Sequence, residues 1–275
     1  MRMCCARNFV SSQRMHSMNE VMVILDWQFS PPDYFEESIS ISRNDYAMVI
    51  EDGKVEARIT ATNFDANAHM RNTLHEALND RFLGVQLLSH RPYELSKPRV
   101  IKLHPDGHKD YFIELEGAQM TLTGGTVDFR VTDKHGNVIS DSKRARIEKK
   151  KSLAELVSAY RSSDLVLSAL LNSQGTAVRD PDNELVHLYE IRDGLSKRFG
   201  DERAAKSALG ITPSAWSRIG QLCNGEPLRQ GRHRGKSTGG LRDATDAELM
   251  EARGIARSMI ESYLQYLERL KGTAA

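Results

Sequence analysis

The chain has 275 residues, a length typical of one large domain or two modest ones. Hydrophobic residues make up 40% and charged residues 27%, a mixture that excludes a wholly disordered or fibrous protein. Lys and Arg number 38 against 37 Asp and Glu, so the net charge of +1 gives the chain no overall attraction for a polyanion.

Cysteine content and the length of apolar runs bear on the cellular compartment and on membrane association. The cysteines are Cys4, Cys5 and Cys223, too few for a disulfide framework, so we expect a reducing, cytoplasmic location. The longest apolar runs, 21–25 and 165–167, are far shorter than the ~20 residues needed to cross a bilayer, so we expect no membrane partner.

Residues 1–17 differ from the rest of the chain. They contain arginines and no acid, and they lack the apolar core of a secretory signal, although they resemble a short transit peptide. They are either a disordered leader or a mis-assigned start ahead of Met18, and we leave them out of the fold.

Residues 18–150 predict a strand-rich α+β domain. The predicted strands are 21–27, 46–51, 54–60, 98–104, 111–115 and 126–131. Asp52-Gly53 between two of them supplies the positive φ values of a two-residue hairpin turn, and 135–137 predicts another turn. Over 65–82 the period changes, because apolar residues recur every four positions as on one helix face: Met70, Leu74, Leu78 and Phe82.

Residues 151–275 predict an all-α helical bundle that follows a basic run at 143–151. Ser152-Leu-Ala-Glu155 and Thr245-Asp-Ala-Glu248 have the spacing of capping boxes, in which side chains cap each other's backbone amides. Asp180-Pro181 begins a helix that ends at Gly200, and two shorter helices follow. The basic run is either a solvated edge strand and linker, an extension of a nucleic-acid surface, or a localisation signal.

The densest polar feature lies between two of these helices, at residues 224–240. Its cations fall within eight positions with His233 among them, and Glu226 is the only acid of the segment: Arg229, Arg232, Arg234 and Lys236. Guanidinium groups bind two phosphate oxygens at once, and glycines allow close backbone approach, so the segment predicts a phosphate site. The alternative is a solvated loop whose arginines pair with helix C-termini and nearby carboxylates.

A helix-turn-helix is a second interpretation of the neighbouring sequence. A short helix over 201–209, a glycine turn at Gly210 and a helix carrying Trp216 and Ile219 follow that pattern, although Lys206 stands where a small residue is expected. In this interpretation the second helix reads DNA, and Arg218 joins the predicted nucleic-acid contacts. A short helix, a glycine and a capped second helix are also common in plain helical packing.

The same region resembles the HEPN superfamily of helical domains found in prokaryotic RNA-targeting and toxin systems. The resemblance covers at most 152–271 and rests on Arg229-x-x-x-His233 followed by a long helix, whereas the family has four to six residues between arginine and histidine. It implies metal-independent RNA cleavage, with His233 as the general acid/base and Arg229 holding the scissile phosphate.

Other candidates are weaker. His104 and His108 flank a Pro-Asp-Gly turn that could bring two metal ligands together, but solvated turn histidines are more common, and we predict no metal site and no cofactor. Cys223 lies on an apolar stripe and is expected in the core.

Taken together, the sequence predicts a protein that contacts nucleic acid phosphates, RNA rather than DNA, through the basic loop. The alternatives are a sequence-specific helix-turn-helix DNA regulator and a non-catalytic protein-interaction module. We also expect a homodimer as one arrangement, because a composite phosphate site would need two copies of the loop. The N-terminal domain would then sense, dock a protein partner or oligomerise.

Overall fold

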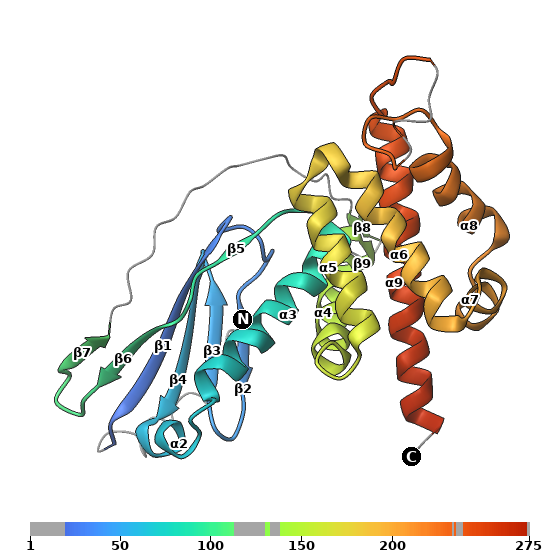
Figure 1. Cartoon of the computed structure of the whole chain (residues 1–275). Helices are drawn as coiled ribbons and strands as arrows, with labels where there is room; N and C mark the ends of the chain where they lie inside the picture. Colours follow the sequence, from blue (N-terminus) through green and yellow to red (C-terminus); the bar gives the residue numbers. More distant parts are fainter. Residues whose placement is uncertain (1–19, 113–129, 133–137, 233, 235–238, 274–275) are drawn as a thin grey trace. The chain divides into compact units, whose positions relative to one another are not determined.

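The computed structural model describes residues 20–112, 130–132, 138–232, 234 and 239–273. The fold is α+β as the sequence predicts, with an antiparallel sheet in the N-terminal part and helices in the C-terminal part (Figure 1). The leader, residues 1–17, lies outside the described residues.

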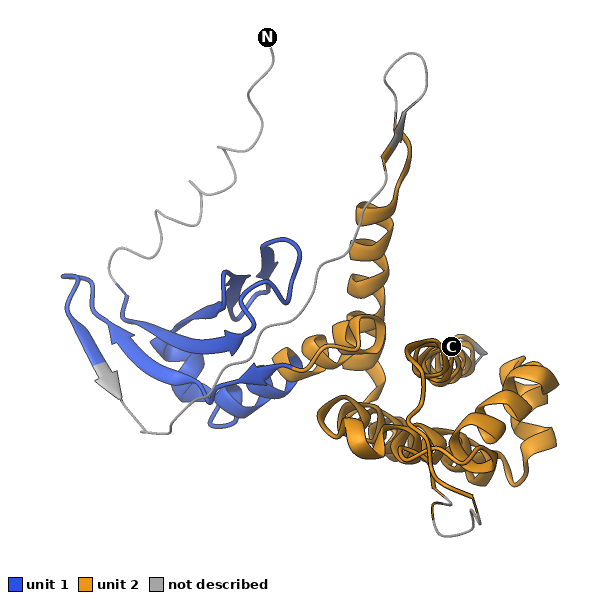
Figure 2. Ribbon diagram, turned by 90° about the horizontal axis from the view of Figure 1, so that it is seen from above, with its two compact units in different colours: residues 1–77, 93–126 blue, residues 78–92, 127–275 orange. Residues whose placement is uncertain are grey.

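The chain forms two compact units (Figure 2). Unit 1 comprises residues 1–77 and 93–126, and unit 2 comprises residues 78–92 and 127–275. Helix α3 (Met70–Ser89) therefore contributes its first turns to unit 1 and the rest to unit 2. The boundary that the sequence suggests near residue 150 falls inside helix α4 (Ser142–Tyr160).

Unit 1 is built on an antiparallel sheet with the strand order β2-β3-β4-β1-β6-β7, and the short β5 pairs with the end of β1. Its strands are β1 (Met22–Ser30), β2 (Ile39–Ser42), β3 (Ala47–Glu51), β4 (Lys54–Thr60), β5 (Glu94–Leu95), β6 (Arg99–Leu103) and β7 (Lys109–Phe112). The predicted hairpin is confirmed, because Glu51 pairs with Lys54 and the φ angles of Asp52 and Gly53 are +46° and +79°.

The two faces of this sheet differ in polarity. Residues paired directly across neighbouring strands share a face, so one face is apolar and buried: Val23, Leu25, Trp27, Met48, Ile50, Val55, Ala57 and Ile59. The opposite face carries Asp26, Glu56 and Arg58, and Asp26 pairs with Arg99 of β6. One buried face and one polar face explain the alternating pattern of β3 and β4.

The helical stretch predicted over 65–82 is two helices. Helix α2 (Ala61–Ala66) begins where the Thr60 side chain accepts from the Asn63 amide (3.3 Å), and α3 begins at Met70. Met70, Leu74, Leu78 and Phe82 are all buried, so the predicted apolar stripe is confirmed. In unit 1, α3 lies on the apolar face, because Trp27 Nε1 donates to His75 Nδ1 (3.1 Å).

Unit 2 is mainly helical. Its helices are α4, α5 (Leu165–Arg179), α6 (Glu184–Phe199), α7 (Glu202–Leu209), α8 (Pro213–Gly220) and α9 (Asp246–Thr273), with short turns η1 (Pro181–Asn183) and η2 (Gln221–Gly225). Strands β8 (Arg130–Thr132) and β9 (Val138–Asp141) form a separate pair at its start. The rest of the strand predicted over 126–131, and the turn at 135–137, lie outside the described residues.

Helix α4 corrects the interpretation of the basic run at 143–151 as an edge strand and linker. The helix begins after Asp141, whose side chain accepts from the Arg144 amide (2.9 Å), so the spacing of Ser152 and Glu155 lies within a helix and is no cap. Lys, Arg and Glu are strong helix formers, and the buried Ile147 extends the apolar stripe of the later turns into the basic run.

The helix start predicted at Asp180-Pro181 is corrected, because the short turn η1 lies there and α6 begins at Glu184. Three other predicted boundaries are confirmed. Gly200 follows α6, and Asp201 caps α7 by accepting from the Ala204 amide (2.7 Å). Thr245 and Glu248 form the second capping box at the start of α9. Within the described ranges, no helix combines the length and apolar character that crossing a membrane requires.

Candidate functional site

The predicted basic segment joins η2 to α9, and we call residues 226–244 the arginine loop. Its two ends lie side by side, because Leu228 and Arg242 form an isolated parallel bridge. The Arg229 amide donates to the Arg242 carbonyl (2.9 Å), and the Arg242 amide donates to the Pro227 carbonyl (3.1 Å). Leu228 is buried. These hydrogen bonds therefore close the base of the loop, and the Arg232 amide joins the loop to η2 by donating to the Cys223 carbonyl (2.9 Å).

The structure divides the predicted site residues. His233 and Lys236 lie outside the described residues. The predicted contacts that the structure does describe are Arg218, Arg229, Arg232 and Arg234. All but the first of these lie on the arginine loop, and their partners sort them into two groups.

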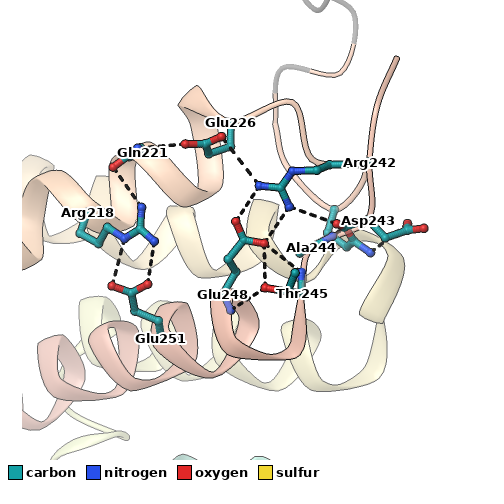
Figure 3. Close-up of polar contacts among 10 residues, drawn as sticks. Arg218, Gln221, Glu226, Arg242, Asp243, Ala244, Thr245, Glu248 and Glu251 are labelled. Atoms are coloured by element: carbon teal, nitrogen blue, oxygen red, sulfur yellow. Dashed lines mark hydrogen bonds and ion pairs between the residues drawn. The ribbon is translucent and has the colours of Figure 1, made fainter. Parts of the chain in front are cut away.

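Arg218 and Arg242 are held by two-point contacts with α9 (Figure 3). Arg218 donates from Nε and Nη2 to the two oxygens of Glu251 (3.0 and 2.8 Å). Arg242 donates from Nη1 and Nη2 to those of Glu248 (2.8 and 2.7 Å). Two-point ion pairs have defined geometry, so both arginines connect α8 and the loop to α9 and are structural.

Arg234 is also held by hydrogen bonds to other residues of unit 2. Its Nη2 donates to the Asp182 carbonyl (3.0 Å) and to the Asn183 side chain, and its Nε donates to the Gly231 carbonyl (3.1 Å). These contacts join the loop to the turn before α6 through backbone and amide oxygens.

Arg229 and Arg232 have weaker, more exposed partners. Arg229 Nε lies 3.7 Å from Asp243 Oδ1, with side chains 64% and 72% exposed. Arg232 Nη1 donates to Asp193 Oδ2 (2.8 Å), with side chains 38% and 50% exposed. Exposed single-point ion pairs contribute about 0–1 kcal/mol, so these two guanidiniums can exchange their carboxylates for another anion.

The helix-turn-helix elements are present, but carboxylates gather at the C-terminal end of the second helix, α8. Gly210 has φ +67°, and Thr212 caps α8 by accepting from the Ala215 amide (3.2 Å). Trp216 and Ile219 are buried as that motif requires. Around Arg218 and Arg242, at the C-terminal end of α8, lie three carboxylates (Figure 3): Glu226, Glu248 and Glu251. A phosphate backbone would meet surplus negative charge there, which favours the arginine loop as the contact.

An open groove of about 500 Å³ lies between the α7–α8 turn and α9. Its walls include Ile211, Ala215, Met250 and Ile255. Its walls also include Arg257 and Ser258 but no described residue of the arginine loop, so the groove is separate from the candidate site.

The turn histidines and Cys223 are the other candidates, and each has a local structural explanation. His104 and His108 both contact Asp110 (2.9 and 3.1 Å), and the hydrogen bond from His104 is the main cause that lowers the pKa of this carboxyl. Among the residues that the structure describes, no three potential ligands are grouped to hold a metal ion. Cys223 is fully buried, as predicted, and burial raises its thiol pKa to about 12.

The Glu248 contacts predict a pH-dependent contribution to stability. The hydrogen bonds from Arg242, and then from the Thr245 amide, lower the pKa of this carboxyl to about 2. Because the folded pKa is depressed, the contribution is complete above the unfolded value near 4.5 and is lost as the pH falls towards 2.

Glu248→Gln keeps the capping geometry and removes the charge. We expect it to lower the free energy of unfolding at pH 7 by about 1 kcal/mol. Urea unfolding of both proteins from pH 7 to pH 2 should show the difference shrinking below pH 4.5. A difference of constant size down to pH 2 would show that the charge is not its cause.

Comparison with protein-family models, with curated proteins and with solved structures finds no match to this chain.

Proposed function

We propose that unit 2 binds nucleic acid through Arg229 and Arg232 of the arginine loop, with RNA favoured over DNA. The observation that carries this proposal is that each of the two arginines has a single-point ion pair, whereas Arg218 and Arg242 are each held at two points. Both partners, Asp243 and Asp193, are exposed, so replacing either carboxylate by a phosphate oxygen costs the fold about 1 kcal/mol or less.

The chemistry of the two side chains suits this role. A guanidinium group keeps its charge at every physiological pH and presents a planar fork of donors that matches two phosphate oxygens. The fixed base of the loop holds both arginines on one short segment of backbone.

The element that carries the arginines favours RNA. Helix-turn-helix proteins read duplex DNA by inserting a helix into the major groove, and α8 has carboxylates at its end. Sequence-specific RNA recognition targets loops, bulges and single strands, whose phosphates and bases a surface loop can reach.

The predicted result concerns the salt dependence of binding. Arg229→Gln with Arg232→Gln should weaken RNA binding and lower the slope of log affinity against log salt by about 1.4, because each lost phosphate contact on a single strand removes about 0.7. Fluorescence anisotropy of a labelled RNA and of a duplex DNA, from low to physiological salt, measures both quantities.

The matched control removes the same charge elsewhere on unit 2. Lys197 and Arg203 are exposed cations on α6 and α7, so Lys197→Gln with Arg203→Gln should leave the slope within about 0.3 of the wild type. An equal loss in both double variants would contradict a contact at the arginine loop. No affinity of the wild type at ~150 mM salt would contradict nucleic-acid binding and favour a protein-interaction module.

Cleavage is measured on the same samples by a denaturing gel without metal. The HEPN resemblance predicts RNA cleavage that Arg229→Ala and His233→Ala both abolish. Bound but intact RNA would leave a binding protein without that activity.

A further inference from the structure

Arg232 is the most exposed member of a cluster of cations and aromatic rings in unit 2. Its Cζ lies over the ring of Tyr189, 4.5 Å from the centroid. Arg192 Cζ lies 5.1 Å from the same centroid and 5.2 Å from that of Trp216. The Arg229 side chain differs: among the contacts that the structure describes, its partner is the Asp243 carboxylate and no aromatic ring.

Hydrogen bonds hold the other members of this cluster, Tyr189, Arg192 and Trp216, in place. Arg192 donates to the Tyr189 hydroxyl (2.6 Å) and to Glu202 Oε2 (3.1 Å). The indole Nε1 of Trp216 donates to the same Glu202 oxygen (3.1 Å). Tyr189 is 8% exposed and Trp216 is 1% exposed, so the ring under Arg232 is fixed.

Asp193 orients the guanidinium of Arg232 without covering it. The contact with Asp193 is a single hydrogen bond from Nη1, and the Arg232 side chain remains 38% exposed. A guanidinium donates hydrogen bonds from its edges, whereas its flat faces stack on rings. Arg232 can therefore bind a phosphate at its edge while a base stacks on the face directed away from Tyr189.

We propose that Arg232, supported by Tyr189, is a stacking platform for an unpaired base, so that the ligand of the arginine loop is single-stranded RNA. This inference rests on the proposed function and specifies its ligand. Unstacked bases of single-stranded RNA stack on guanidinium planes as well as on aromatic rings, whereas the bases of a duplex are already stacked.

The test compares Arg232→Lys with Arg229→Lys. Both variants keep the charge and remove the guanidinium plane, but only Arg232 lies over a ring. The probes are a short single-stranded RNA carrying one fluorescent adenine analogue and the same strand annealed to its complement. Affinity and quenching of the fluorescent base are measured for each probe.

We expect the wild type to prefer the single strand and to quench its fluorescence. Arg232→Lys should weaken binding of the single strand about tenfold, abolish the quenching and leave duplex affinity within about twofold, because stacking one base contributes roughly 1–3 kcal/mol. Arg229→Lys should affect both probes equally and keep the quenching.

A second pair of variants tests the ring beneath Arg232. Tyr189→Phe keeps the ring and removes the hydroxyl, and it should retain the single-strand preference. Tyr189→Leu removes the ring and should reduce that preference as Arg232→Lys does, with its folding checked by circular dichroism. If Arg232→Lys weakens both probes equally, the stacking proposal is wrong while phosphate binding stands. If the wild type binds neither probe, the proposed function is wrong, and the platform with it.

Discussion

Gly84→Ala is expected to lower the free energy of unfolding of unit 2 by about 3 kcal/mol, because overpacking a tight helix contact typically costs 1–3 kcal/mol or more. A Cβ atom at residue 84 would lie 2.3 Å from Ala154 Cα and 2.6 Å from Ala154 N. Both are backbone atoms of α4, so no side chain can rotate away to make room. Helices α3 and α4 must move apart instead.

Gly254→Ala is the matched control for this prediction. Gly254 lies within α9, and a Cβ atom there would meet nothing within 4 Å. Alanine should therefore raise the free energy of unfolding by about 0.5–1 kcal/mol through its higher helix propensity. Urea unfolding followed by circular dichroism measures both variants. Equal stability of Gly84→Ala and the wild type would contradict the close approach of the two helices.

Arg253→Ala is expected to destabilise unit 2 by about 3 kcal/mol, at the low end for breaking a buried ion pair because Arg253 is partly exposed. Arg253 donates from Nε and Nη2 to the two oxygens of Glu184 (2.5 and 2.7 Å). Glu184 is 1% exposed, and its other neighbour is His90, whose Nε2 lies 3.2 Å away. Removing the guanidinium leaves a carboxylate buried beside one imidazole.

Arg257→Ala is the matched control, because Arg257 lies one turn later on α9 and its side chain is also 34% exposed. Its partner Glu261 is held by Lys149 as well (3.0 Å), so this variant should lose about 1 kcal/mol or less. Equal losses of unfolding free energy in the two variants would contradict the claim that leaving Glu184 buried without its arginine is what destabilises Arg253→Ala.

The stability of these variants should also depend on pH. Burial raises the pKa of Glu184, but hydrogen bonds from Arg253 and His90 outweigh it and lower the pKa overall. In the wild type, the ionised carboxylate therefore stabilises the fold above its unfolded pKa, and this contribution is lost in acid. In Arg253→Ala, burial dominates and raises the pKa, so the difference between the two proteins should narrow as the pH falls.

Local signals in the sequence predict much of the fold. Asp52-Gly53 identifies its hairpin because the turn needs two positive φ values. The Thr245 and Glu248 capping box and the stop at Gly200 place helix ends correctly, since each acts within about one turn of backbone. Such features depend on neighbours in the chain and need no tertiary contacts.

Signals that depend on distant residues are harder to interpret. The basic run at 143–151 forms part of α4, and Ile147 within it is buried in the core. The charged residues on either side of Ile147 give no sign of this burial in the sequence. Asp193 lies 39 residues before Arg232 in the chain, and nothing in the sequence relates Tyr189 to the arginine loop. The sequence identifies the basic loop, whereas only the structure separates its exchangeable arginines from Arg234 and Arg242.

The most direct measurement of the central proposal is a map of where RNA touches the protein. A single-stranded RNA containing 4-thiouridine is cross-linked by light to the full chain at physiological salt, and mass spectrometry identifies the modified peptides. The account predicts cross-links to residues 226–244, with Arg232 among them. Cross-links confined to α8, or to the basic turns of α4, would contradict it.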